Sequence, residues 1–114
     1  MEFLISIQSQ VAPRKVAAVA SGLRRAINGL PGVSYTGQVI NQGSPQLSSC
    51  EILLVGLPPS TVPAVLNMVK SHTARPGLGS VTVEIATDGL KASFEPQVLT
   101  QDQLKRLAGA LSGP

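Results

Sequence analysis

The sequence predicts an α+β fold in which two to three amphipathic helices pack on a mixed sheet of four to five strands. Apolar residues at every second position, the pattern of half-buried strands, occur in four segments: 2–8, 33–39, 81–86 and 90–95. Apolar residues at three- and four-residue steps, the pattern of amphipathic helices, occur in three segments: 13–30, 62–73 and 101–111. The predicted order is β-α-β-(β)-α-β-β-α, and such interspersed elements are typical of helices packed on one sheet.

The best-defined part of the chain is a predicted hairpin over residues 81–94. Its apolar positions alternate with polar or small ones in both strands: Val81, Val83 and Ile85 in the first, and Leu90, Ala92 and Phe94 in the second. Asp88 and Gly89 between them tolerate the positive φ angles of a type I′ turn, so we expect a structural turn there that fixes the register. The second strand is the candidate interaction edge, because a partner strand can add to an unpaired edge.

The other predicted elements rest on local patterns. Residues 2–8 carry apolar side chains on both faces, which favours a central strand. Residues 51–56 fit a fully buried strand or a short buried helix, and their β-branched content favours the strand. Ser60 or Thr61 is expected to cap the helix that follows. The segment Thr100–Gln103 has the form of a capping box, which predicts the start of the last helix.

Length and composition predict one domain over residues 1–114 with an aliphatic core. Hydrophobic residues make up 43% of the chain but aromatic residues only 3%, so Val, Leu, Ile and Ala must fill that core. Charged residues make up 13%, about half of the usual quarter. A surface with so little charge favours contact with a protein partner or with a second copy, and the alternative is a neutral monomer covered by Ser, Gln and Gly.

A basic face is predicted on the first helix. Arg14, Lys15, Arg24 and Arg25 lie largely off its apolar stripe and contribute to a net charge of +3. Such a face attracts acidic partners, and weak nucleic-acid binding through it is one alternative function. The chain has one tyrosine, two phenylalanines and no tryptophan, so it lacks the stacking platforms that single-stranded nucleic acid needs. Nucleic acid is therefore not the favoured partner.

The reactive residues form no recognisable catalytic set. Cys50, His72 and Asp88 would supply a nucleophile, a base and an orienting acid, but Cys50 lacks an activating surrounding and is expected to be a packing residue. His72 is expected near a helix C-terminus, and Tyr35 in a strand with its hydroxyl in water. A small enzyme or regulator that uses Cys50 or Tyr35 is the other alternative. We predict a protein without catalytic residues, cofactor or metal.

The cysteine count and the hydropathy pattern bear on location. A single cysteine excludes an internal disulfide. The N-terminus shows neither a basic region nor a long apolar stretch, and no apolar run reaches the length of a membrane span. The sequence therefore predicts a cytoplasmic protein with no membrane span.

The region around the hairpin also carries a family resemblance. An aliphatic helix from Val62 to Thr73 with a basic residue near its end leads into Val81-Thr-Val-Glu-Ile85, which is followed by Asp88-Gly89 and a second short strand. In this order of features the chain resembles the effector-associated constant component family of prokaryotic conflict systems. The resemblance is strongest over residues 60–95. The chain departs from the family pattern in the Gly/Pro-interrupted segment 56–59 and in its added C-terminal helix.

The resemblance implies a non-enzymatic adaptor. Domains of this family accompany effectors, such as caspase-like or trypsin-like peptidases and TIR domains, and sensors in bacterial defence or signalling systems. We therefore expect a protein partner from the same locus, with homo-oligomer formation as a further option. The family pattern is structural, so it assigns no functional residue to this chain.

Overall fold

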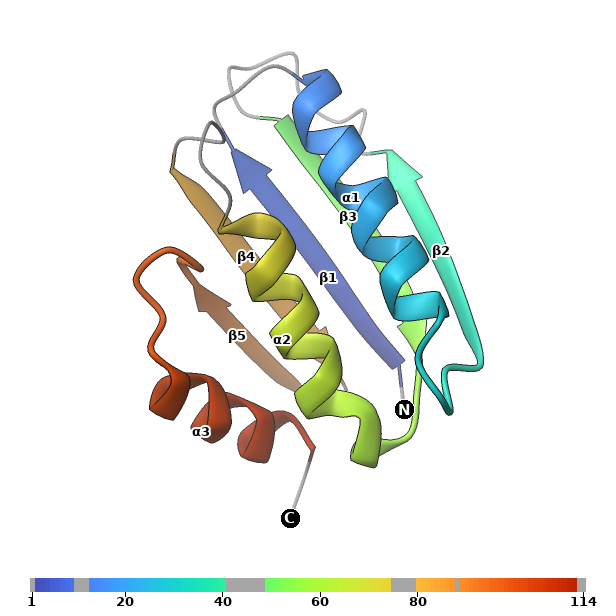
Figure 1. The fold of residues 1–114 in the computed structure, drawn as a ribbon, viewed down its shortest axis with the longest axis vertical. Helices are drawn as coiled ribbons and strands as arrows, with labels where there is room; N and C mark the ends of the chain where they lie inside the picture. Colours follow the sequence, from blue (N-terminus) through green and yellow to red (C-terminus); the bar gives the residue numbers. More distant parts are fainter. Residues whose placement is uncertain (1, 10–12, 41–48, 75–79, 88, 113–114) are drawn as a thin grey trace.

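The computed structural model describes residues 2–9, 13–40, 49–74, 80–87 and 89–112, with the side chains of all of these except 13, 38–40 and 49–51. The elements are, in chain order, β1 (Glu2–Ser9), α1 (Pro13–Asn28), β2 (Tyr35–Ile40), β3 (Ser49–Gly56), the 3₁₀ turn η1 (Pro59–Thr61), α2 (Val62–Thr73), β4 (Val81–Thr87), β5 (Leu90–Phe94) and α3 (Gln101–Leu111). The predicted α+β class and the predicted order of elements are confirmed (Figure 1).

The strands form one five-stranded sheet in the order β2-β3-β1-β4-β5. Every neighbouring pair is antiparallel, where a mixed sheet was expected. The helical connections do join parallel strands, β1 to β2 and β3 to β4, but β3 inserts between the first two and β1 between the second two. Parallel strands are therefore never neighbours. This is the split β-α-β connectivity of the ferredoxin-like fold, extended here by β5 and α3.

Residues 51–56, which fitted a strand or a helix, belong to β3. This strand pairs with β1 from Glu2 opposite Gly56 to Ser9 opposite Ser49, and with β2 from Tyr35 opposite Gly56 onward. Two neighbours satisfy the backbone groups on both sides of the strand, which explains why this leucine-containing run is extended. The central position expected for the first strand is confirmed, since β1 is the third of five.

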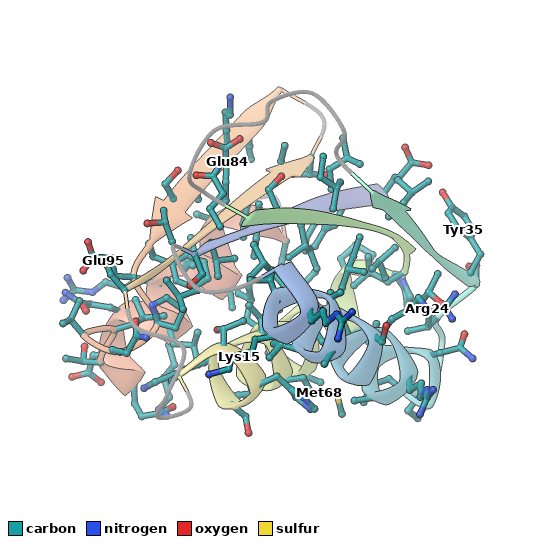
Figure 2. The ribbon with its side chains drawn as sticks, turned by 90° about the horizontal axis from the view of Figure 1, so that it is seen from above. Lys15, Arg24, Tyr35, Met68, Glu84 and Glu95 are labelled. Atoms are coloured by element: carbon teal, nitrogen blue, oxygen red, sulfur yellow. The ribbon has the colours of Figure 1, made fainter. Side chains whose placement is uncertain are left out.

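All three helices lie on one face of the sheet, and no helix of the described chain covers the other (Figures 1 and 2). The strands point alternate residues into the helix layer, and the buried ones are Phe3, Ile5, Ile7, Leu53, Val55, Val81, Val83 and Ile85. They join one core with the apolar stripes of the helices: Val16, Ala20, Leu23, Ile27, Val62, Val65, Leu66, Val69, Leu104, Ala108 and Leu111. None of the helices in the described ranges is long and apolar enough to cross a membrane.

The two later helices start in different ways. At α3 the predicted capping box is confirmed: the Gln103 N–H donates to Thr100 Oγ1 at 3.2 Å, and the Thr100 N–H donates to Gln103 Oε1 at 2.9 Å. At α2 the expected side-chain cap is wrong, because η1 precedes the helix and Thr61 makes no cap bond. Its hydroxyl instead donates to the carbonyl oxygen of Pro31 at 3.2 Å, which ties the start of α2 to the turn before β2.

The predicted hairpin is formed by β4 and β5. Val83 lies opposite Phe94, and Thr87 lies opposite Leu90. Gly89 has a φ of 74°, as the predicted turn requires, whereas Asp88 lies outside the described residues. A Cβ atom at Gly89 would meet nothing within 4 Å, so backbone conformation and not space demands glycine at this position.

Candidate functional site

Four large apolar side chains are exposed in the described part of the chain, and they fall into two groups. Leu4 and Tyr35, each 44% exposed, lie on the helix-free face of the sheet. Leu90 is 47% exposed at the start of β5, and Val98 is 69% exposed just beyond its end. The two groups mark two candidate contact surfaces.

The first surface is the apolar centre of the helix-free face, formed by Leu4, Ile52, Leu54 and Ala86, and is called the open face below. Leu4 of β1 lies opposite Leu54 of β3 and Ala86 of β4. One pair further along, Ser6 lies opposite Ile52. Opposite residues of an antiparallel pair share a face, so these side chains form one patch across the three central strands.

A tyrosine borders the open face at one end. Tyr35 of β2, Gly56 of β3 and Glu2 of β1 stand in one row across three strands. The Tyr35 ring lies over Gly56, where a Cβ atom would come within 2.7 Å of the ring atoms Cδ1 and Cζ. The hydroxyl donates a hydrogen bond to Oε2 of Glu2. This bond, aided by desolvation and by the charge of Glu2, raises the pKa of Tyr35 and keeps the phenol protonated.

The contact between Tyr35 and Glu2 was not foreseen from the sequence. Gly56 stands before Leu57 and two prolines, where it suggests only the end of an element. Its role appears once the register is known, because the missing side chain leaves room for the ring of its cross-strand neighbour. An aromatic residue packed over a strand glycine is a recurrent way of stabilising such a position.

An ion pair borders the open face on the other side. Lys91 Nζ lies 3.3 Å from Oε1 of Glu84, and the Ser93 hydroxyl donates to Oε2 of Glu84 at 3.5 Å. Glu84 projects from the helix-free side of the sheet in Figure 2. The side chains of this pair are 68% and 40% exposed, so the pair adds little stability, but it neutralises both charges.

The second surface is a hollow of about 470 Å³ between the end of β5 and α3, called the β5–α3 hollow below. It is lined by the end of β5, the turn after it and one side of α3: Ser93, Phe94, Glu95, Val98, Leu99, Gln103, Arg106 and Leu107. Phe94, Leu99 and Leu107 are half-buried against the core and give the hollow an apolar floor. Arg106 and Glu95 supply one cation and one carboxylate to the lining.

The candidate interaction edge is an edge strand of the sheet, since β5 has β4 as its only neighbour in the strand order. Its three apolar residues differ in surroundings. Ala92 and Phe94 are half-buried opposite the core residues Ile85 and Val83, whereas Leu90 is exposed. Partner binding at this edge stays a prediction.

The candidate basic face lies on α1. Arg14, Lys15 and Arg25 are exposed, whereas Arg24 is half-buried and its Nε has no hydrogen-bond partner among the described residues. Arg14 and Arg24 stand ten residues apart, which corresponds to about 15 Å along the helix axis. The face therefore presents cations near both ends of α1.

The three residues considered as a nucleophile, a base and an orienting acid are placed only in part. Cys50 belongs to β3, opposite Gln8 of β1, but its side chain lies outside the described part of the structure, as does Asp88. His72 lies in the last turn of α2, as expected. It is half-buried beside α1, where a Cβ atom at Gly22 would be 3.8 Å from its Nδ1. The packing of His72 against α1 was not foreseen.

Comparison with known proteins adds little. No protein-family model matches the chain, and no curated protein matches it. One of the similar solved structures is the apo form of LarC2, the C-terminal domain of a cyclometallase involved in the synthesis of the NPN cofactor of lactate racemase. The identity is 10% over 99% of this chain and 88% of LarC2, with a TM-score of 0.38. A similarity this low gives no indication of a ligand or an activity for this chain.

Proposed function

We propose that this protein is a non-enzymatic adaptor in the cytoplasm of a bacterium, where it docks a protein partner at the β5–α3 hollow. The partner is an effector or a sensor from the same locus, such as a peptidase or a TIR-domain protein, as the resemblance of residues 60–95 implies. The observation that carries the proposal is an edge strand that ends in an apolar hollow.

An edge strand beside a hollow suits an extended segment of a partner. Such a segment can form main-chain hydrogen bonds with an edge strand, and its alternate side chains then meet the same side of the sheet. A side chain that enters the hollow would contact Phe94, Leu99 and Leu107, which favours an aliphatic residue. A neighbouring carboxylate would find the guanidinium of Arg106. The proposed ligand is therefore an extended segment with an aliphatic and an acidic residue.

The state of Tyr35 bears on the alternative of an enzyme that uses this residue. Its hydroxyl donates to Glu2, and its raised pKa lowers the fraction of phenolate at neutral pH. A hydroxyl nucleophile needs a neighbouring base that accepts its proton during attack, and a lowered pKa helps further. Glu2 stands where such a base would, so the geometry does not exclude the alternative of an enzyme that uses Tyr35, and only the raised pKa weighs against it.

The test is binding to the products of neighbouring genes, measured by calorimetry with the purified full chain. We expect Arg106→Glu and Val98→Glu to weaken binding by about tenfold or more, since they place a carboxylate beside an acidic ligand or an apolar contact. Lys105→Glu is the matched control: it makes the same charge change one residue away on α3 but does not line the hollow. Its effect should stay within about threefold.

The alternatives give different results in the same experiment. A protein that binds none of the neighbouring products contradicts the proposal, and so does an equal loss of binding in all three variants. Binding that falls steeply with salt and is competed by single-stranded nucleic acid would indicate the basic face of α1 instead. Cys50→Ser should leave partner binding within a few-fold, whereas loss of function with an intact fold would favour chemistry at Cys50.

A further inference from the structure

We infer that the open face is the contact surface of a symmetric homodimer, in which two copies pack their sheets against each other. The inference goes beyond the proposed adaptor function and concerns a surface other than the β5–α3 hollow. It rests on how apolar and charged side chains are distributed between the two sides of the molecule.

The open face is an apolar centre on a side of the sheet that also carries polar residues, such as Ser6, Gln8 and Thr82. An antiparallel sheet with helices on one side and water on the other normally alternates apolar and polar residues along each strand. Here β1 carries Leu4 at a position that faces away from the helices, and β3 carries Ile52 and Leu54. Ala86 of β4 extends the same patch. These four apolar side chains lie in three adjacent strands. Their removal from water by a second protein surface would therefore be favourable.

Of the two carboxylates at the border of this face, one is paired with a cation and the other accepts a hydrogen bond within the same copy. Glu84 pairs with Lys91, and Glu2 accepts a hydrogen bond from Tyr35. Covering a charge that lacks a partner is strongly unfavourable, and even a paired charge loses its hydration, so these residues suit the rim of a contact and not its centre. Two open faces can therefore meet at their apolar centres while Glu2 and the pair of Glu84 with Lys91 stay at the solvated rim.

Two copies cannot pack through their helices in the same way, because the helix side is strongly positive. The helices hold a single acid, Asp102, against seven cations: Arg14, Lys15, Arg24, Arg25, Lys70, Lys105 and Arg106. Two copies that met through their helices would bring like charges together, which is costly. Two copies that meet through their sheets keep both basic layers outside. Of the two sides, the open face is therefore the one on which a second copy can pack.

The helix-free side as a whole, with the open face at its centre, approaches the size of a dimer interface. Five strands spaced by about 4.8 Å span roughly 24 Å with their side chains, and strands of five to eight residues extend about 17–26 Å. The flat area is then about 500 Å², and the accessible area is larger because side chains stand out from it. Standard interfaces bury about 800 Å² per partner, so a stable dimer would use most of the helix-free side, with the open face as its apolar centre.

The test is sedimentation velocity of the full chain over concentrations from low micromolar to near millimolar. We expect a reversible dimer whose affinity Leu4→Glu lowers by well over tenfold. In a symmetric dimer both copies carry the substitution, so two carboxylates are placed in the contact. Leu90→Glu is the matched control, since Leu90 is 47% exposed against 44% for Leu4 but lies outside the open face. It should leave the dimer affinity within about twofold. Leu4→Thr, which suits a strand, provides a second variant if Leu4→Glu unfolds the chain.

The same variants separate this inference from the proposed adaptor function. Leu4→Glu should remove the dimer and leave binding of the partner segment in place, whereas Arg106→Glu should do the reverse. A wild-type chain that stays monomeric at every concentration would overturn the inference, and so would a dimer that Leu90→Glu dissociates as readily as Leu4→Glu. Loss of partner binding in Leu4→Glu with a monomeric wild type would assign the open face to that partner instead.

Discussion

Successive residues of β1 show how different the two faces of this sheet are. Ile5 is fully buried under the helices, opposite Leu53 and Ile85, whereas Leu4 beside it is 44% exposed opposite Leu54 and Ala86. Both faces share the same backbone, register and ladder hydrogen bonds. They differ in their side chains and in what covers them. Folding of the monomer therefore depends on one face, and the other is free to serve contact.

The two faces are also held together by different means. On the helix side, many aliphatic side chains each contribute a part of one core. On the open side, a few specific contacts fix the border: the Tyr35 ring over Gly56, its hydrogen bond to Glu2, and the pair of Glu84 with Lys91. Mutations should thus have large effects on stability on the helix side and small, specific effects on the open side.

The largest difference is expected between two neighbouring alanine substitutions in β1. Ile5→Ala removes a fully buried side chain and should lower the free energy of unfolding by about 2–5 kcal/mol. Leu4→Ala should lower it by less than about 1 kcal/mol when measured in dilute, monomeric protein. Chemical denaturation followed by circular dichroism gives both values. Similar losses for the two variants would mean that the open face is covered within the monomer.

The hairpin turn provides a reference that belongs to neither face. Gly89→Val places a β-branched side chain at a φ of 74° with no atom within 4 Å of its Cβ, so its cost is backbone strain alone, about 1–2 kcal/mol. The melting temperature should fall by several degrees. Gly89→Asn should cost less, because asparagine tolerates positive φ. An unchanged melting curve for Gly89→Val would show that the turn adopts another conformation in solution.

Local patterns in the sequence were sufficient to predict the helices and strands of this fold. The period of 3.6 in the stripe that begins at Val16, the alternation around Val83 and the capping box at Thr100 each lie within a single element. The antiparallel order of the sheet was not predictable in the same way. It depends on β3 inserting between β1 and β2, which is decided by packing between distant segments.

The candidate surfaces were less predictable for the same reason. The contact between Tyr35 and Glu2 joins residues 33 positions apart, and the sequence alone does not show that Gly56 lies between them. The β5–α3 hollow depends on how α3 returns beside β5, which no periodicity encodes. The choice of β5 as an edge was predictable, because the strand is short and followed by Pro96.

A double-mutant cycle tests whether Tyr35 is the reason for a glycine at position 56. Gly56→Ala should cost about 1 kcal/mol in the wild type, because the new methyl group displaces the ring. In the Tyr35→Ala background the same change should be neutral or stabilise by about 0.5 kcal/mol, since alanine loses less backbone entropy than glycine. Equal effects in both backgrounds would show that the two residues are not coupled.

The smallest effect concerns the titration of Tyr35, which can be observed without interference because the chain has one tyrosine and no tryptophan. Its hydrogen bond to Glu2 favours the protonated phenol, so the phenolate absorbance should appear at a higher pH than in the unfolded chain. Glu2→Gln removes the negative charge and should bring the pKa back toward about 10. Identical titration curves for the wild type and Glu2→Gln would contradict the contact.

The same shift predicts how stability depends on pH. The pKa of Tyr35 is higher in the folded than in the unfolded chain, so the stabilisation by its bond to Glu2 is complete below about pH 10. It is lost as the pH rises through the folded pKa. The free energy of unfolding of the wild type should therefore fall relative to that of Tyr35→Phe only in alkaline solution. If a dimer covers the open face, desolvation should raise the pKa of Tyr35 further at high protein concentration. The titration of Tyr35, at the border of that face, would then report on dimer formation.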